Sequence, residues 1–405
     1  MVNPTAIGHD VSMRHIDDDE RRARLARRHG LAGGHPDVLS ATRAMTVLHA
    51  TEAATVHLAL WARVPGLALA DVDAALYDDR VLVKQLAMRR TLFVFPRDLL
   101  PATWGSAAAR VAVQQRKQLV KWVVQAGLAD DPDNWLDVVL ADVLEAMADG
   151  VPRTTRELRS LVPALEGRFT LGTPEKKWGG DFPIGAWVMT TLGAEGRVVR
   201  GVNAGHWRLN KPTWVRTDLW LQDAPEAWPE DKGYAELVGR WLATFGPGTE
   251  TDIAWWLGAT KTIVRRALAD VGAVQVALDG GGSGWVLPDD LEPEEPVAPW
   301  AALLPTLDPT VMGWKERAFY LDPADTPYLF DSNGNAGNTV WWDGRVVGCW
   351  VQDDKAVVRV LLRQDVGTEA AAALEAEAER LTDWLGGVRI VNVYASPQMK
   401  GARLG

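Results

Sequence analysis

The 405-residue sequence contains a single cysteine, and this scarcity excludes two kinds of chemistry. One thiol cannot form an intrachain disulfide bond and cannot build a cysteine-based zinc site. Cys349 lies between Val347 and Trp350 in a predicted strand, where a buried and inert thiol is expected. A redox function is therefore not expected.

The sequence also lacks the features of membrane and secreted proteins. No apolar run reaches the roughly 20 residues that a membrane-spanning helix requires. Near the N-terminus the acidic run Asp17–Glu20 is followed by Arg21, Arg22 and Arg24, and the apolar core of a secretory signal is missing. We expect a cytoplasmic protein without a membrane partner.

Signatures of nucleotide cofactors and metals are missing too. The glycine run Gly280–Gly284 lacks the strand-to-helix setting of a phosphate loop or a dinucleotide fingerprint. His49, His57 and His206 are the only histidines in the predicted domains, and no cysteine or paired carboxylate stands at ligand spacing beside them. We therefore predict no cofactor, no nucleotide and no metal.

One pattern of elements occurs three times: a helix with a polar start, a turn, a second helix with basic residues, and a short hairpin. It is clearest after Thr249, where polar N-cap residues precede a predicted helix over Ile253–Leu257. Gly258 then breaks the chain before a second helix over Thr262–Val271. This order predicts a helix-turn-helix.

Two predicted strands, Val274–Ala277 and Trp285–Leu287, complete this unit. The segment between them, Asp279–Gly284, is so rich in glycine that it predicts a hairpin loop. The whole unit has the pattern of a winged helix, a structure that often binds duplex nucleic acid.

The other two copies are less regular. In the second, we predict a first helix at Arg153–Arg159, a second at Phe182–Leu192 and a hairpin at Arg197–Val215. In the first, Ala70–Asp73 begins a helix, the second is predicted over 81–88, and 89–95 alternates as a strand does. The uneven spacing indicates duplicated domains with insertions, and not a solenoid.

The formal net charge of -10 hides a separation of charges. Nine basic residues and one acid, Asp98, lie between Arg80 and Lys121, whereas 130–149 carries seven acids and no base. Such blocks suggest a basic face that contacts phosphates and acidic surfaces elsewhere. The alternative is that each basic run is only a solvated helix face.

Turn and linker signals divide the chain into five parts. The acidic, proline-rich stretch Glu292–Pro296 is the strongest linker signal. The predicted parts are a poorly ordered or loosely packed segment (1–36), winged helix 1 with a helical extension (37–127), winged helix 2 (128–221), winged helix 3 (233–288) and a β-barrel with a C-terminal helix (289–405).

The C-terminal part has a different character from the rest. Short strand-like runs alternate with turns there, which predicts a small curved sheet or barrel and an α+β fold overall. The predicted strands are Phe319–Leu321, Tyr328–Phe330, Thr339–Trp342, Arg345–Val351 and Ala356–Leu362, and the predicted helix is Thr368–Trp384.

Four short sequence motifs in this part resemble those of a known family. They are Leu303–Asp308, Gly313–Arg317, Asp331–Asn335 and Asp343–Trp350. With the expected winged helices, they make the chain similar to the winged-helix DNA glycosylases of the AlkZ and YcaQ type, over nearly everything after about Val38. The resemblance implies action on alkylated purines, and in some members the unhooking of interstrand crosslinks.

The resemblance also locates a candidate active site, because the family carries Gln-x-Gln or Gln-x-Asp about a dozen residues before Trp-x-Arg. Here the anchor is Trp61-Ala62-Arg63, which places the motif on His49-Ala50-Thr51 with both polar positions changed. An alkylated purine is already a good leaving group, so the enzyme needs an aligned water and a stabilised sugar cation.

Neutral His49 and Thr51 are the candidates that would orient this water. Glu52 could supply a negative field for the sugar cation if it points inward. Protonated His49 would repel the cationic purine, which predicts that activity falls below the imidazole pKa of about 6.5. The competing interpretation makes Thr51 a helix N-cap, His49 a buried or phosphate-binding histidine, and His57 a helix-face residue.

DNA-contacting candidates come from the basic runs and the predicted hairpins. Most of the 20 tryptophans are expected in the core, and only the hairpin tip His206-Trp207 is a candidate wedge. The predicted contacts are Arg89, Arg90, Arg110, Arg116, Lys117, Arg197, Arg200, His206, Trp207, Arg208, Lys211, Lys315 and Arg317.

These expectations describe a monofunctional DNA glycosylase that removes bulky N-alkylated purines, or unhooks crosslinks, by water attack at the deoxyribose C1′. Its expected partner is damaged double-stranded DNA in the nucleoid, and a monomer is expected. The alternative is a non-catalytic winged-helix protein that binds DNA or recognises damage. A transcription regulator is a weaker third alternative, and sequence preference over undamaged competitor DNA would identify it.

Overall fold

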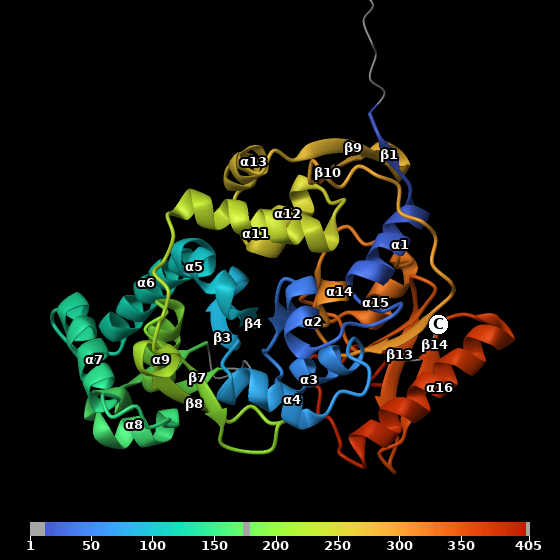
Figure 1. Ribbon diagram of the computed structural model, residues 1–405. Helices are drawn as coiled ribbons and strands as arrows, with labels where there is room; N and C mark the ends of the chain where they lie inside the picture. The colour runs from blue at the N-terminus through green and yellow to red at the C-terminus, as the bar shows by residue number, and fades with distance from the viewer. Residues whose placement is uncertain (1–12, 173–178, 402–405) are drawn as a thin grey trace, which may run out of the picture.

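The computed structural model describes residues 13–172 and 179–401, which form a mixed α/β fold. We call residues 37–127 the first unit, 128–221 the second unit, 233–288 the third unit and 289–401 the C-terminal region. In Figure 1 the first unit lies at the centre, with the second unit to its left, the third above it and the C-terminal region to its right.

The first unit is built on a three-stranded antiparallel sheet of order β2–β4–β3. Its elements are α2 (Val38–Ala44), β2 (Leu48–His49), α3 (Ala53–Trp61), α4 (Leu69–Asp73), β3 (Leu82–Ala87), β4 (Thr91–Pro96), α5 (Leu100–Thr103) and α6 (Ala109–Gln125). The helix expected over 81–88 is wrong: the segment is strand β3, whose side chains alternate between two faces and whose Gln85 pairs with Phe93. The strand expected over 89–95 is confirmed from Thr91 onward as β4, whereas Arg89 and Arg90 form the turn before it.

The second unit contains α7 (Pro132–Ala146), α8 (Thr155–Leu161), β5 (Arg168–Leu171), β6 (Gly180–Pro183), α9 (Gly185–Ala194), β7 (Val198–Asn203), β8 (Pro212–Arg216) and α10 (Thr217–Leu221). Thr154 caps α8 and Glu157 returns the hydrogen bond, which fixes the start of this helix. The helix expected from Phe182 begins later, at Gly185, because the preceding residues pair with β5 as β6. The hairpin expected over 197–215 is confirmed as β7 and β8.

The third unit contains most of α11 (Glu230–Phe245), which begins just before it, and α12 (Glu250–Leu257), α13 (Lys261–Asp270), β9 (Val274–Leu278) and β10 (Ser283–Val286). Thr249 and Asp252 form a capping box at the start of α12, and Gly258 ends that helix with a left-handed φ of 62°. The helix-turn-helix and the hairpin expected here are both confirmed. Strand β1 (His15–Ile16) adds to this hairpin in parallel with β9.

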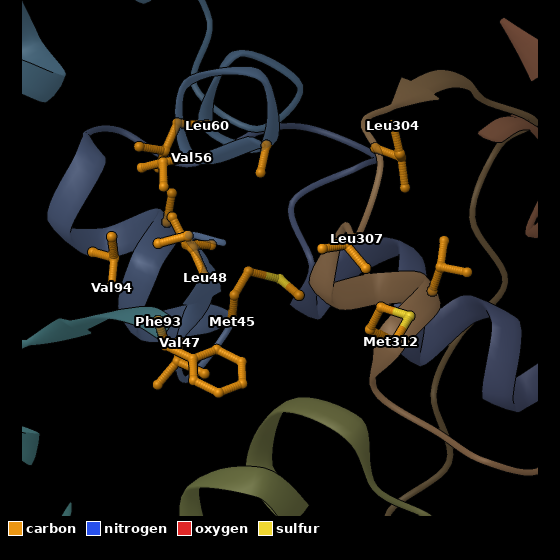
Figure 2. Close-up of a cluster of buried hydrophobic side chains, with 14 of the residues drawn as sticks. Met45, Val47, Leu48, Val56, Leu60, Phe93, Val94, Leu304, Leu307 and Met312 are labelled. Atoms are coloured by element: carbon orange, nitrogen blue, oxygen red, sulfur yellow. The ribbon is translucent and has the colours of Figure 1, made fainter. Parts of the chain in front are cut away.

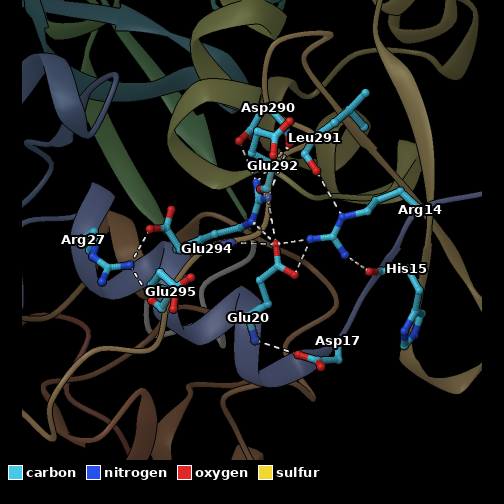
Figure 3. A network of polar contacts seen from close by, with 12 residues as sticks. Arg14, His15, Asp17, Glu20, Arg27, Asp290, Leu291, Glu292, Glu294 and Glu295 are labelled. Carbon is cyan, nitrogen blue, oxygen red and sulfur yellow. Dashed lines mark hydrogen bonds and ion pairs between the residues drawn. The ribbon is translucent and has the colours of Figure 1, made fainter.

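The N-terminal segment departs from expectation, because residues 13–36 are well packed and not loose. Helix α1 (Asp18–Arg28) buries Arg24, which is only 1% exposed. Arg24 Nη1 donates to Asp290 Oδ1 over 2.7 Å. Figure 3 shows two more basic side chains of this segment, Arg14 and Arg27, bound to the acidic linker. The pairing of opposite charges therefore anchors the stretch that was expected to be an open linker, while residues 1–12 lie outside the described chain.

The C-terminal region carries a four-stranded antiparallel sheet of order β11–β12–β13–β14. Its elements are β11 (Ala301–Leu304), α14 (Pro309–Met312), α15 (Thr326–Leu329), β12 (Thr339–Trp342), β13 (Arg345–Gln352), β14 (Val358–Leu362) and α16 (Gly367–Leu385). Three expected strands and the helix are confirmed. Of the other two, Tyr328 and Leu329 end α15 and Phe330 forms an isolated bridge with Ala336, while Phe319–Leu321 forms turns. The expected barrel is not confirmed, because β11 and β14 are the two edges of an open sheet over the described residues.

Two large hydrophobic cores and two small clusters hold these parts together. The main core joins the first and third units to the C-terminal region, and Figure 2 shows Met45, Leu48 and Phe93 in one cluster with Leu307 and Met312. A separate core fills the second unit and takes in the end of α6. Cys349 is buried in the C-terminal sheet, as expected, and burial raises the pKa of its thiol to about 12.

None of the described helices combines the length and the apolar character needed to cross a membrane.

Candidate active site

A cavity of about 270 Å³ lies between the first unit and the C-terminal region. We call it the His49 cavity. It is lined by His49, Thr51, Arg89, Arg90, Thr91, Leu307, Met312, Asn335 and Tyr394. Both polar positions of the expected His-Ala-Thr motif therefore line one cavity, because alternate residues of an extended segment face the same side.

His49 is buried, with 4% of its surface exposed, and its ring centroid lies 4.6 Å from that of Phe93. Neither ring nitrogen has a hydrogen-bond partner among the described residues. Burial, followed by the positive charge of Arg89, holds the pKa of His49 well below its ordinary value. The imidazole is thus neutral at physiological pH, and both of its nitrogens are available to a ligand or to water.

Thr51 is half-buried beside His49 and does not cap a helix, so the competing expectation for this residue is wrong. Helix α3 begins at Ala53, and its N-cap residue is Glu52, which makes no side-chain cap hydrogen bond. The Thr51 hydroxyl therefore remains available to the cavity.

Glu52 does not point into the cavity, and its expected role as a source of negative field is not supported. Its side chain is 7% exposed, and Oε1 accepts the backbone N–H of Tyr394 over 2.9 Å. Burial raises the pKa of Glu52, while the N–H groups of Val393 and Tyr394 act in the opposite direction. Glu52 thus positions the C-terminal segment whose Tyr394 lines the His49 cavity.

The tip of the β3–β4 hairpin brings two cations to the cavity. Arg89 and Arg90 have positive φ values of 55° and 57°, a left-handed conformation that costs a non-glycine residue of order 1–3 kcal/mol. Residues held in this way cluster at functional sites. Here the strained turn places consecutive arginines at the mouth of the cavity, and Arg90 is exposed.

Arg89 is held by the third unit and the C-terminal region together. Its guanidinium carbon lies 4.2 Å from the ring centroid of Trp255, and that of Arg317 lies 5.1 Å from the same ring. Burial, followed by the charge of Arg317, lowers the pKa of Arg89 to about 10, so the side chain stays charged at neutral pH. Gly258 makes the approach possible, because a Cβ there would lie 2.9 Å from Arg89 Cγ.

The His49 cavity is electrostatically positive. Two arginines line it, and none of its lining residues carries a carboxylate. It can attract phosphate and orient water at a neutral imidazole. It offers no negative side chain to a sugar cation.

The remaining DNA-contact candidates are distributed over several elements, and two of them are paired with acids. Arg116 is paired with Asp137 at 2.7 Å, and Arg197 with Glu195 at 3.8 Å. Arg110 lies beside a tyrosine of the third unit. Lys117 and Lys315 are exposed, on α6 and close to Arg317 respectively.

A second cavity, of about 280 Å³, lies between the first unit and the β7–β8 hairpin. Lys84 and Leu92 line it, whereas Thr91 lines the first, so the two cavities open on opposite faces of the β2–β4–β3 sheet. We call it the Lys84 cavity. Its lining includes Ala50, Ala53, His57, Asp73, Tyr77, Asp78, Lys84, Leu92, Arg200, Gly201, Val202, Asn203, Gly205, Trp207 and Leu209.

The tip of the β7–β8 hairpin does not have the form of the wedge expected from His206-Trp207. Trp207 turns inward, and its ring centroid lies 4.9 Å from that of His57 and 5.8 Å from that of Trp384. His57 is 2% exposed and is therefore not a helix-face residue in contact with solvent. Arg200 lies over Trp214 at 3.6 Å, whereas His206, Arg208 and Lys211 are exposed or partly exposed.

Several cavity residues were not singled out from the sequence. Leu307 and Asn335 lie in phrases that carry the family resemblance, so a signal for them existed. Tyr394 lies outside any motif, and Glu52 accepts its backbone N–H. Over residues 13–172 and 179–401, no cluster of three or more His, Cys, Asp or Glu side chains could hold a metal ion.

Comparisons with known proteins bear on this site. A family model described as DNA glycosylase AlkZ-like matches residues 42–384. Among solved structures, the DNA glycosylase AlkZ of Streptomyces sahachiroi is similar to this chain, with a TM-score of 0.72 and 20% sequence identity over 93% of this chain and 98% of that one. A comparison with curated proteins finds no match. At this level of identity the structural likeness shows the fold.

Proposed function

The chain belongs to the AlkZ-like DNA glycosylase family, and from this membership we propose that it excises bulky N-alkylated purines, or unhooks interstrand crosslinks, in the His49 cavity. The observation that carries the proposal is the buried imidazole of His49, which faces the cavity and has no hydrogen-bond partner among the described residues. Water is the proposed nucleophile at the deoxyribose C1′.

Neutral His49 suits this reaction because the alkylated base leaves without protonation. One ring nitrogen accepts a hydrogen bond from the attacking water and takes its proton as the bond to C1′ forms. Thr51 offers a second hydrogen-bond partner to the same water. The purine departs as a neutral base, and the bond between C1′ and the base nitrogen breaks.

Duplex binding completes the proposal. The helix-turn-helix and hairpin elements of the second and third units act as winged helices that contact the duplex, and Arg90 and Lys315 contact phosphates near the cavity. The protein works on chromosomal DNA as a monomer, and no cofactor takes part in the proposed reaction.

The experiment measures release of the alkylated base from a duplex that carries N7-alkylguanine, with alkali treatment to reveal the abasic sites. We expect His49→Ala to lower the rate about 10²-fold or more. His49→Gln, which restores the carboxamide found in the family, should retain more activity than His49→Ala. His15→Ala, which changes an exposed histidine on β1, is the matched control and should not alter the rate.

Equal base release by the wild type and by His49→Ala would contradict the proposal. So would a His49→Gln variant that folds normally but falls to the level of His49→Ala, because a carboxamide should also orient the water.

One observation favours a second candidate function, a non-catalytic protein that recognises damage. No carboxylate lines the His49 cavity, and two arginines do, so an oxocarbenium ion would meet positive charge there. This candidate predicts tight binding to alkylated duplex with no base release, unchanged by His49→Ala. The same base-release assay, run beside a binding titration, separates the two.

A further inference from the structure

The Lys84 cavity holds reactive side chains that base excision at His49 does not use. Lys84 Nζ lies 2.9 Å from the Tyr77 hydroxyl, and His57 Nε2 lies 3.8 Å from Asp73 Oδ1. Strand β3, helix α3, the end of α4 and the helical turn after it bring these groups together, and residues of the β7–β8 hairpin line the same cavity. The cluster combines an amine, a phenol, an imidazole and a carboxylate around one space.

At neutral pH a larger fraction of Lys84 is the nucleophilic free amine than of an ordinary lysine. Burial lowers the pKa of Lys84 to about 8, with Arg200 acting in the same direction and Asp73 in the opposite one. About a tenth of the amine is therefore unprotonated at pH 7, against less than about a thousandth for a solvated lysine. Desolvation beside another cation is a known way to activate a lysine for imine formation.

The surroundings of Lys84 are suited to a polar ligand. The titratable and charged groups that face it across the cavity are His57, Asp73, Tyr77, Asp78 and Arg200. His57 is 2% exposed, and neither of its ring nitrogens has a hydrogen-bond partner among the described residues. Arg200 Nε and Trp207 Nε1 are buried without a partner there as well. Such groups indicate a ligand with several oxygen atoms.

The size of the cavity narrows the class of ligand. Its volume of about 280 Å³ lies just below the range of about 300 to 1,000 Å³ for small-molecule sites. A single sugar with a flanking phosphate suits this space, in which Arg200 and Lys84 offer cationic partners to the phosphate beside the carboxylates of Asp73 and Asp78. A sugar that reacts with an amine must present an aldehyde.

We propose that the Lys84 cavity is an abasic-site lyase site, in which Lys84 forms an imine with the ring-opened deoxyribose aldehyde of an abasic site in DNA. The choice of substrate rests on the proposed function, since base excision generates such a sugar. The activity itself is separate from base excision, because it occupies the other face of the sheet.

The proposed reaction needs no oxidant or reductant. The free amine of Lys84 adds to C1′, and the carbinolamine loses water to give the imine. His57 takes the C2′ proton, the C3′–O bond breaks, and the 3′ phosphate leaves on the downstream strand. Water then hydrolyses the imine, which releases an unsaturated aldehyde on the upstream strand and restores Lys84.

The test uses the full chain and a duplex with a preformed abasic site, so that it does not depend on base excision. Borohydride added during the reaction should reduce the imine and give a covalent protein–DNA adduct, with strand cleavage in its absence. Lys84→Met and Lys84→Arg should each lower adduct and cleavage at least about 10²-fold, because neither side chain can form the imine. Lys84→Arg keeps the charge and guards against loss of the fold.

Lys355→Met is the matched control, since Lys355 is an exposed lysine of the C-terminal region, and it should leave trapping unchanged. Adduct at the wild-type level in a folded Lys84→Arg variant would overturn the proposal, as would failure of the wild type to form any adduct. Loss of base release in His49→Ala with normal trapping would support this inference independently of the proposed glycosylase activity.

Discussion

The two cavities on either side of the β2–β4–β3 sheet differ in chemistry although they share the same strands. The His49 cavity presents a neutral imidazole, a hydroxyl and two arginines, and no carboxylate lines it. The Lys84 cavity mixes an amine, a phenol, an imidazole and two carboxylates. Alternation along a strand is enough to give one small sheet two chemically different faces.

The two cavities also differ in what encloses them. The His49 cavity is closed by Leu307 and Met312, which belong to the main core. The Lys84 cavity is closed by the β7–β8 hairpin. This hairpin belongs to the second unit, and most of that unit packs in a separate core. The geometry of the first cavity therefore depends on the main core, and that of the second depends on how the second unit docks.

The largest expected effect is on stability, and it tests whether the two cavities depend on different cores. Arg63 donates to both oxygens of Asp308 over 2.9 and 2.7 Å, and both side chains are 0% exposed. Removing one partner leaves a buried charge, so Arg63→Met should lower the free energy of unfolding by about 3–5 kcal/mol. Chemical denaturation followed by tryptophan fluorescence measures this change.

The separate core of the second unit adds a second expectation. Denaturation should show two transitions, and Arg63→Met should move only the one that belongs to the main core. Arg43→Met, which breaks the exposed pair with Asp98, should move neither by a comparable amount. A single transition that shifts as a whole would contradict the division into two cores.

A smaller expected effect is a difference in pH dependence between the reactions proposed for the two cavities. Lysine reacts as the free amine, and because the pKa of Lys84 is lowered to about 8, borohydride trapping should rise about 10-fold from pH 7 to pH 9. His49 is neutral above its own lowered pKa, so base release should stay level through pH 6.5 and fall only in more acidic solution. The fall near pH 6.5 that the sequence suggested is thus displaced by burial.

Parallel pH profiles of base release and trapping provide the measurement. Profiles that rise and fall together would show that one group controls both reactions, contrary to two separate sites.

The smallest effect concerns the position of Tyr394 at the His49 cavity. Glu52→Gln keeps an oxygen that accepts the Tyr394 N–H, so base release should change by less than about 3-fold. Glu52→Ala loses a hydrogen bond worth about 0.5–1.5 kcal/mol, and its KM should rise about 2- to 10-fold with kcat little altered. Trapping at Lys84 should be unaffected by both changes. A large fall in kcat for Glu52→Gln would instead make Glu52 part of the chemistry.

The local features of the fold were predictable from the sequence, and the distant ones were not. Thr154 and Thr249 identified helix starts because a cap is formed within one turn. Strand β3 was mistaken for a helix because its conformation depends on pairing with β4. The packing of α1 was missed because Arg24 finds its acidic partner 266 residues away.

The candidate site shows the same division. The spacing from Trp61 and Arg63 located the His-Ala-Thr motif, and the structure places His49 and Thr51 on one cavity. The direction of Glu52 could not be predicted, because its partner Tyr394 is distant in the sequence. The inward turn of Trp207 depends on His57 and Trp384, which belong to other parts of the chain.

Gly258 connects the most regular repeat of the sequence, the helix-turn-helix of α12 and α13, to the His49 cavity. Its left-handed backbone and its closeness to Arg89 are two independent reasons why no side chain fits there. A side chain at position 258 would displace Arg89 at the His49 cavity, although residue 258 does not itself line that cavity. The turn that ends α12 is consequently a site where a distant substitution would change the lining of the His49 cavity.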